Sequence, residues 1–216
     1  LEERHWWFRG RRTVYLGLLR HHLGGQRPAR VLDLGCGVGG FLAGLAEIGG
    51  RVVATDMDRA SLGTCRERGF PRCVVSDGYE LPFADGSLSH LILFDVFHHL
   101  RAPGAFFREA RRALQPQGRV IVFDPFISLA SWPVYGLLHH EPVAIKEAIN
   151  YATELPRPRD YYAAQGNATR LFFRDEGAGW PQGWEVFHRE AFSAFHYVLS
   201  GGFSKPAMYP AGMLGA

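Results

Sequence analysis

The stretch from Val31 to Phe41 constrains the fold of this chain more than any other. It starts as a short apolar run that contains one acid, Asp33, and it ends in a cluster of glycines. Apolar residues at helical spacing follow at once, from Phe41 to Ile48. The glycines allow a sharp turn and the close approach of a ligand, while the first N–H groups of the helix face the gap. The sequence therefore predicts a strand, a ligand-binding turn and a helix.

Two acids bear on which ligand this turn holds. Gly35, Gly37 and Gly40 satisfy the dinucleotide pattern G-x-G-x-x-G, which is a weak signal by itself. Asp33 argues against a dinucleotide because its carboxylate would repel a pyrophosphate, whereas it would suit an ammonium group. Asp56 follows a second predicted strand, and an acid at that distance from the glycines can accept hydrogen bonds from both ribose hydroxyls. The alternative role of a helix N-cap fits Asp58 better, just before the helix expected from residue 59.

Strands alternate with amphipathic helices along the first 125 residues. This order predicts an α/β fold, a Rossmann-like doubly wound and mostly parallel sheet with helices on both faces. Two further segments near the end could close the sheet as antiparallel strands. The expected helices are 12–23, 41–48, 59–68 and 103–114, and the expected strands are 31–34, 52–55, 73–76, 91–94, 119–124, 184–188 and 192–199.

The run Asp-Leu-Gly-Cys-Gly-x-Gly, from Asp33 to Gly39, resembles the first motif of class I S-adenosylmethionine (SAM) dependent methyltransferases. The segments 81–87, 98–100 and 114–120 are similar to further segments of that family, so the resemblance covers residues 30–125. One detail departs from it: Ser89 and His90 stand where the family commonly has an acid. The resemblance implies SAM as cofactor, S-adenosylhomocysteine as product and transfer of a methyl group.

The resemblance also implies a set of cofactor-binding residues. In the family the glycine turn cradles the methionine part of SAM, Met57 would lie against the adenine, and Asp77 would receive the adenine amino group. Asp77 and Gly78 equally fit a plain turn that closes a strand. The candidate cofactor-binding residues are Asp33, Gly35, Cys36, Gly37, Gly39, Asp56, Met57, Asp77, Gly78 and Phe94.

The regions on either side of this core carry two further expectations. Residues 6–12, His-flanked aromatics followed by arginines, resemble a methyltransferase leader, and they fit a lid over SAM and plain packing equally well. The apolar segment 126–138 fits a core helix or a flap over an apolar acceptor. His139 and His140 follow it and are the candidate catalytic residues, as a general base, although they could equally cap a helix. The adjacent histidines His98 and His99 fit either a structural role or the role of a general base.

These observations predict one methyltransferase domain over 1–216, with an N-terminal cap (1–29), a SAM-binding core (30–125) and an acceptor-pocket and sheet-closing region (126–216). The expected activity is methyl transfer to a small-molecule acceptor, for which apolar and lipid-linked molecules fit. An NAD(P)-dependent oxidoreductase and a non-catalytic SAM-binding protein are the alternatives. We expect no bound metal, no nucleic-acid partner and no transmembrane segment. Three cysteines without paired spacing indicate a reducing, cytoplasmic compartment. The oligomeric state is left open.

Overall fold

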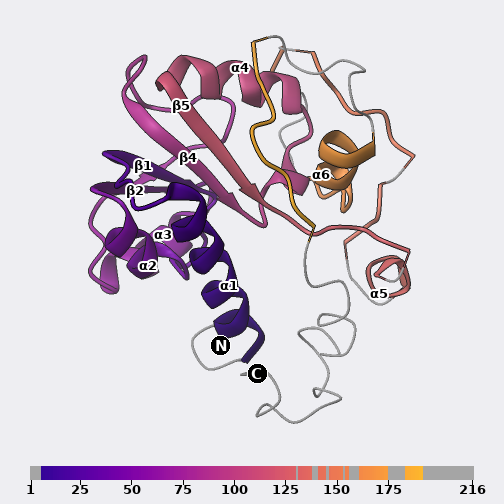
Figure 1. The fold of residues 1–216 in the computed structure, drawn as a ribbon, viewed down its shortest axis with the longest axis horizontal. Coiled ribbons are helices and arrows are strands. Elements are labelled where there is room, and N and C mark those ends of the chain that lie inside the picture. Colours follow the sequence, from indigo (N-terminus) through magenta and orange to yellow (C-terminus); the bar gives the residue numbers. More distant parts are fainter. Residues whose placement is uncertain are drawn as a thin grey trace.

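The computed structural model describes residues 6–129, 131–137, 141–144, 146–152, 154–155, 161–174 and 183–191. Five parallel strands form one sheet in the order β3-β2-β1-β4-β5, with helices on both faces (Figure 1). This confirms the predicted Rossmann-like α/β fold. The strands are β1 (Arg30–Leu34), β2 (Arg51–Asp56), β3 (Cys73–Val75), β4 (Leu88–Phe94) and β5 (Leu114–Phe123). The helices are α1 (Trp6–Leu23), α2 (Leu42–Ile48), α3 (Arg59–Glu67), η1 (Phe97–His99), α4 (Pro103–Ala113), α5 (Trp132–Leu137), α6 (Asn167–Thr169) and η2 (Arg170–Arg174).

The order of the strands reverses between β1 and β4, which pair with Leu34 opposite Leu93. The chain winds outward through β2 and β3 on one side of β1, then returns to β4 and β5 on the other side. In open parallel sheets a ligand binds at such a reversal, beyond the carboxyl ends of the strands. The glycine turn that follows β1 and the residues that follow β4 therefore share the expected binding edge.

The two faces of the sheet bury alternate residues of the same strands. Leu32 of β1 and Leu91 of β4 pack with α4 in one apolar cluster. Val31 and Ile92, one position away in each strand, pack with α1 and α2 in another. Because Asp33 is two residues from Val31, it emerges on the face covered by α1 and α2.

Helix α1 begins earlier than the sequence pattern predicts. It starts at Trp6 rather than at residue 12, so it carries the aromatic and basic leader as its own first turns. Leu16, Leu19 and Leu23 form its buried row. His22, in the last turn of the helix, is exposed because this row lies on a different side.

Two other predictions near β5 differ from the structure. The strand starts at Leu114 and includes residues 115–118, which were expected to form only a connection, and its pairing with β4 shifts register between Leu88 and His90. Residues 184–188 do not form a strand; instead the Trp184 ring packs 5.3 Å from that of Phe107 on α4. The other expected closing strand, 192–199, lies outside the described residues.

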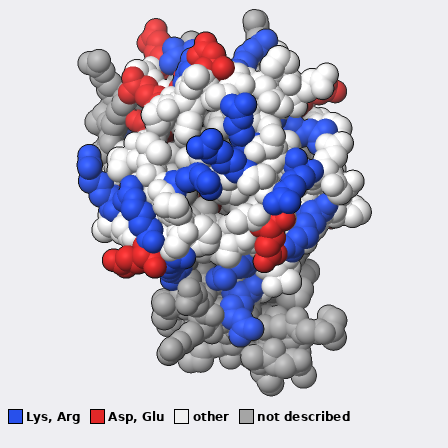
Figure 2. Space-filling view, turned by 90° about the vertical axis from the view of Figure 1, so that its left-hand side faces the viewer, with Lys and Arg blue, Asp and Glu red and all other residues white. Residues whose placement is uncertain are grey.

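The face that carries the β1–β3 side of the sheet is rich in basic side chains (Figure 2). Two arginines at the end of α3 bind backbone carbonyls of neighbouring elements. Arg66 donates to the Cys73 carbonyl at 2.9 Å, and Arg68 donates to the Val38 carbonyl in the glycine turn, also at 2.9 Å. Arg68 therefore joins the end of α3 to the glycine turn, whereas Arg66 binds the first residue of β3. Among the described helices, none has the length and apolar character that crossing a membrane requires.

Candidate active site

The turn after β1 has the backbone conformation that its glycines predict. Gly35, Gly37 and Gly39 all have positive φ, at 71°, 52° and 84°. The N–H groups of Gly35 and Cys36 donate to the Thr55 carbonyl of β2 at 2.8 and 2.9 Å, so the turn is fixed to the neighbouring strand. A Cβ on Gly37 would meet no atom within 4 Å, so this residue faces open space.

Asp33 is a buried acid aimed at that space. Its side chain is 1% exposed, and its Oδ2 atom is buried with no hydrogen-bond partner among the described residues. Burial, and then repulsion from Asp56, raise the pKa of Asp33 to about 7. A buried carboxyl oxygen without a partner carries a substantial free-energy cost, and a cationic ligand group would relieve it.

Asp56, at the end of β2, holds the glycine turn as well as facing the binding edge. Its Oδ2 accepts a hydrogen bond from the Gly37 N–H at 2.8 Å, and its Oδ1 accepts one from the Asp58 N–H at 2.9 Å. Each carboxylate oxygen has a second lone pair, so both can still accept a ligand hydroxyl. Asp58 caps α3 through Ala60 and Ser61, as the sequence predicts.

These residues surround a cavity of about 200 Å³ between the glycine turn, the end of β4 and helix α1. The candidates Asp33, Gly35, Cys36, Gly37 and Phe94 all line it. Ligand pockets usually enclose about 300–1,000 Å³, so a nucleoside-sized ligand would extend out of this cavity along the strand ends. The other lining residues, most of them missed as candidates by the sequence analysis, are Phe8, Arg11, Arg12, Gly40, Phe41 and Asp95.

Helix α1 closes one side of the cavity through an ion pair with the residue that follows β4. An Arg11 N–H donates to Asp95 Oδ2, and the Tyr15 hydroxyl donates to Asp95 Oδ1 at 3.4 Å. Burial raises the pKa of Asp95, and Arg11 opposes this rise. Asp95 itself has a left-handed backbone, with φ of 55°, a strain typical of functional sites. The Arg11 Nε is buried with no hydrogen-bond partner among the described residues, so two residues that line the cavity, Arg11 and Asp33, each have one unmatched polar atom.

Phe41 and Phe94, which line the cavity, belong to an aromatic stack. The rings of Phe41 and Phe94 are parallel with centroids 3.9 Å apart, and Tyr15 stacks on Phe123 at 4.6 Å. The Arg11 guanidinium lies 5.7 Å from the centre of the Phe41 ring. No sequence motif points to Phe41 as part of the site, because an apolar residue at the start of a helix normally indicates core packing.

Five predicted cofactor residues do not line the cavity: Gly39, Asp56, Met57, Asp77 and Gly78. A Cβ on Gly39 would lie 3.0 Å from the Cys65 sulfur, and one on Gly78 would lie 3.2 Å from a Leu34 methyl group, so both glycines serve packing. Asp77 Oδ1 accepts from the N–H groups of residues 79 and 80 at 2.9 and 3.0 Å, which is the plain turn considered as an alternative. Met57 is 62% exposed beyond the end of β2. Asp77 and Met57 remain at the edge over which a long ligand would extend.

His98 sits between two carboxylates beyond the carboxyl ends of β4 and β5. Its Nδ1 lies 3.0 Å from Asp124 Oδ1, and its Nε2 lies 3.5 Å from Glu141 Oε2. Burial acts to lower the pKa of His98, but Asp124 and Glu141 outweigh it and raise the pKa to about 10. A ring that stays protonated at neutral pH cannot act as a base there. The candidate bases His139 and His140 lie outside the described residues.

A second cavity lies beside the segment that was expected to hold the acceptor. It measures about 280 Å³ and is lined by Ile127, Ser128, Leu129, Trp132 and Arg174. Helix α5 tolerates Pro133 in its first turn, where no N–H is needed. Leu129 and Leu137 expose 93% and 71% of their surface, so this segment presents apolar side chains outward.

Comparisons with known proteins agree with this geometry. Residues 32–122 match the model of a methyltransferase domain family. A protein of Mycolicibacterium smegmatis described as a probable SAM-dependent methyltransferase is 35% identical over 127 residues, which cover 58% of this chain and 48% of the relative. Demethylmenaquinone methyltransferase of Corynebacterium efficiens is 32% identical over 132 residues, which cover 61% and 56%. A crystal structure of a protein from Pyrococcus horikoshii has a TM-score of 0.52 and 28% identity over 65% of this chain and 66% of the other.

The resemblance found in the sequence is therefore confirmed for residues 32–122: this region matches a methyltransferase domain, and relatives that share it are described as SAM-dependent methyltransferases. The matched region runs from β1 almost to the end of β5, which includes the glycine turn, Asp56 and Asp95. The chain spans about half the length of the curated relatives it matches.

Proposed function

We propose that this protein transfers the methyl group of SAM to a small-molecule acceptor. The observation that carries the proposal is the cavity at the glycine turn, because two residues that line it, Asp33 and Arg11, have unmatched polar atoms of opposite character. Asp33 Oδ2 suits the ammonium group of the methionine part, and Arg11 Nε suits its carboxylate. Asp56 then takes the ribose hydroxyls, while Met57 and Asp77 lie along the path of the adenine.

Within this proposal α1 acts as a lid as well as a packed helix. Leu16, Leu19 and Leu23 anchor its second half to the body, whereas Phe8 and Arg11 of its first half line the cavity. Aromatic faces around a sulfonium cation add a cation–π attraction. The rings of Phe8, Phe41 and Phe94 are all on the cavity wall, so they suit the charged sulfur of SAM.

The chemistry requires alignment more than a catalytic base. Sulfonium is a good leaving group, so holding the acceptor in line with the methyl group and the sulfur supplies most of the rate. A base is needed only for a poorly ionised hydroxyl or amine. His139 and His140 stay candidates for that role and require an experiment of their own.

The acceptor pocket is proposed beyond the ends of β4 and β5, beside residues 126–141. Asp95 and Asp124 leave the sheet at this edge, and the second cavity and the exposed Leu129 and Leu137 lie next to it. Apolar walls with Arg174 at the margin suit an apolar acceptor that carries a polar head. One relative is named for a quinone-type acceptor, demethylmenaquinone, so quinone precursors belong in any acceptor panel. A cytoplasmic location is proposed from the three free, buried cysteines.

The test compares ligands one at a time by calorimetry: SAM, S-adenosylhomocysteine, NAD and NADP. Binding of the first two with no heat from the dinucleotides is expected, and the reverse pattern would favour an oxidoreductase. Formation of S-adenosylhomocysteine is then measured with a panel of quinone-like, lipid-linked and sugar acceptors. Tight binding without turnover on any acceptor would favour a non-catalytic SAM-binding protein.

A further inference from the structure

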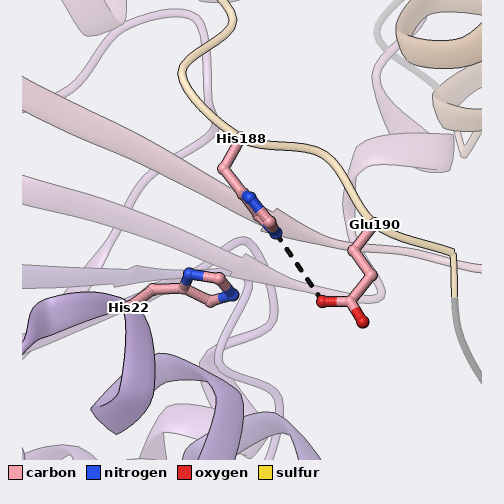
Figure 3. A group of neighbouring side chains, drawn as sticks. All are labelled: His22, His188 and Glu190. Carbon is pink, nitrogen blue, oxygen red and sulfur yellow. Dashed lines mark ion pairs between the residues drawn. The ribbon is translucent and has the colours of Figure 1, made fainter.

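Three polar side chains meet far from the cavity, where the last turn of α1 lies against residues 183–191. His22 lies in the last turn of α1, and His188 and Glu190 belong to the extended segment (Figure 3). One ligand atom from each residue lies within 4.8 Å of the other two. The proposed methyl transfer uses none of these residues.

The local structure explains why they converge. His188 and Glu190 are two positions apart in an extended chain, so their side chains project from the same side. The intervening Arg189 points elsewhere, because its guanidinium donates to the Phe172 carbonyl at 2.9 Å. In the last turn of α1, the guanidinium of Arg20 binds the Glu47 carboxylate at 2.7 Å. The side chains of Arg20 and Arg189 are therefore bound away from the group.

The distances suit a divalent ion. His188 Nε2 and Glu190 Oε2 are 3.6 Å apart, and ligand atoms of a tetrahedral zinc site are separated by about 3.4 Å, given bonds of about 2.0–2.1 Å. The rings of His22 and His188 have centroids 4.0 Å apart at an angle of 41°, so a small side-chain rotation brings both nitrogens to one ion. The carboxyl end of a helix also favours a cation.

From these contacts we infer that His22, His188 and Glu190 form a binding site for a divalent transition metal ion of the zinc class. Two imidazoles and a carboxylate are ligands that such ions prefer, and water completes the coordination. All three residues are exposed, so an ion reaches them from solvent. A bound ion would tie residues 183–191 to the helix that also carries Phe8 and Arg11.

A second group, His98, His99 and Glu141, has similar composition but is a poorer candidate. Both nitrogens of His98 already face carboxylates, and Glu141 accepts from Gln165 at 2.6 Å and from Tyr161. These contacts would have to break before an ion could bind. His99 therefore offers a useful comparison variant.

The test titrates the full chain, after treatment with a chelator, with Zn²⁺ in calorimetry and with Co²⁺ in visible absorption. We expect one saturable site, and His22→Ala and His188→Ala should each weaken it by at least about tenfold, with Glu190→Gln also weaker. The matched control is His21→Ala, which removes the exposed neighbour of His22 outside the group.

Three results would overturn the inference: no Zn²⁺ binding by the parent, parent-like binding by both His22→Ala and His188→Ala, or loss of the site in His99→Ala alone. The melting temperature of the parent should rise with Zn²⁺ and stay constant in His188→Ala. None of these measurements involves SAM, so they stand apart from the test of methyl transfer.

Discussion

The Asp56 carboxylate accepts a hydrogen bond from the backbone N–H of Gly37 at 2.8 Å, which joins the end of β2 to the turn after β1. The same carboxylate accepts from the Asp58 N–H, the residue that caps α3. One side chain therefore fixes the turn, the start of α3 and the proposed ribose position together. Substitution of Asp56 should therefore weaken ligand binding more than substitution of Asp58.

Asp56→Ala should weaken S-adenosylhomocysteine binding by at least about tenfold, because each charge-assisted hydrogen bond contributes about 1.5–3 kcal/mol. Asp58→Ala is the matched control: it removes only the cap of α3, about 1 kcal/mol of stability, and should leave the affinity unchanged. Calorimetry and thermal melting separate the two effects. Equal losses of affinity in both variants would mean that Asp56 acts through the fold alone.

Gly37→Ala should impair binding through the backbone and the cavity at once. The residue has φ of 52°, which disfavours any Cβ by about 1–2 kcal/mol, and its Cβ would enter the open space of the site. The control is Gly63→Ala in α3, where a Cβ also meets nothing and a helical backbone accepts it. We expect weaker S-adenosylhomocysteine binding only in Gly37→Ala; unchanged affinity there would remove the turn from the site.

The sequence predicted this part of the site well because its backbone demands are local. Positive φ at Gly35 and Gly37, the cap at Asp58 and the placement of Asp56 all follow from residue type and short spacing. The role of Gly39 was less well predicted. Its pattern position suggested ligand contact, yet the constraint is Cys65 of α3, which packs against it from a distant part of the chain.

Contacts between distant segments were beyond the reach of sequence patterns. The sequence around Arg11 does not indicate that it pairs with Asp95, because 84 residues separate the two. They meet only because of the position in which α1 packs against the sheet. The same holds for Asp124 and His98, which meet because β5 lies beside β4. The sequence of residues 184–188 is typical of a strand, but the Trp184 ring packs on Phe107 of α4 instead of extending the sheet.

Asp33 should make cofactor binding depend on pH. Its pKa of about 7 means that its carboxyl becomes protonated below pH 7, and the neutral form cannot pair with an ammonium group. Affinity for S-adenosylhomocysteine should therefore fall by up to about tenfold for each pH unit between about pH 7 and 5. Asp33→Asn should bind weakly with no such slope. A parent affinity that is constant over this range would contradict the proposed contact.

The same shift has a consequence for stability without ligand. An acid whose folded pKa is raised destabilises the fold as the pH rises from about 4 to about 7, because the unfolded chain ionises first. At pH 8, Asp33→Asn should thus unfold at a higher denaturant concentration than the parent. Its free energy of unfolding should be larger by at most about 4 kcal/mol. At pH 4 the difference should vanish, which denaturation at both pH values will measure.

His98 should stabilise the fold in a range set by its own pKa. A histidine whose folded pKa is raised stabilises fully below about pH 6.5 and loses that contribution as the pH approaches 10. The pKa of Glu141 is lowered, first by its bond to His98, so its contribution is lost only on acidification. The difference in unfolding free energy between the parent and His98→Asn should therefore shrink between about pH 7 and 10. The buried thiols also destabilise the fold in this pH range, but they do so equally in the parent and in His98→Asn. A difference between the two proteins that stays constant would therefore exclude a charged His98 between Asp124 and Glu141.

Arg11 offers the sharpest separation of lid function from packing. Arg11→Met removes the proposed partner of the ligand carboxylate and leaves Asp95 as a buried acid without its cation, so both affinity and stability should fall. Adding Asp95→Asn removes the stranded charge and should restore most of the melting temperature. The double variant should still bind S-adenosylhomocysteine at least about tenfold more weakly than the parent, with a faster off-rate. If the second substitution restores affinity together with stability, α1 contributes packing to this site and the ligand carboxylate binds elsewhere.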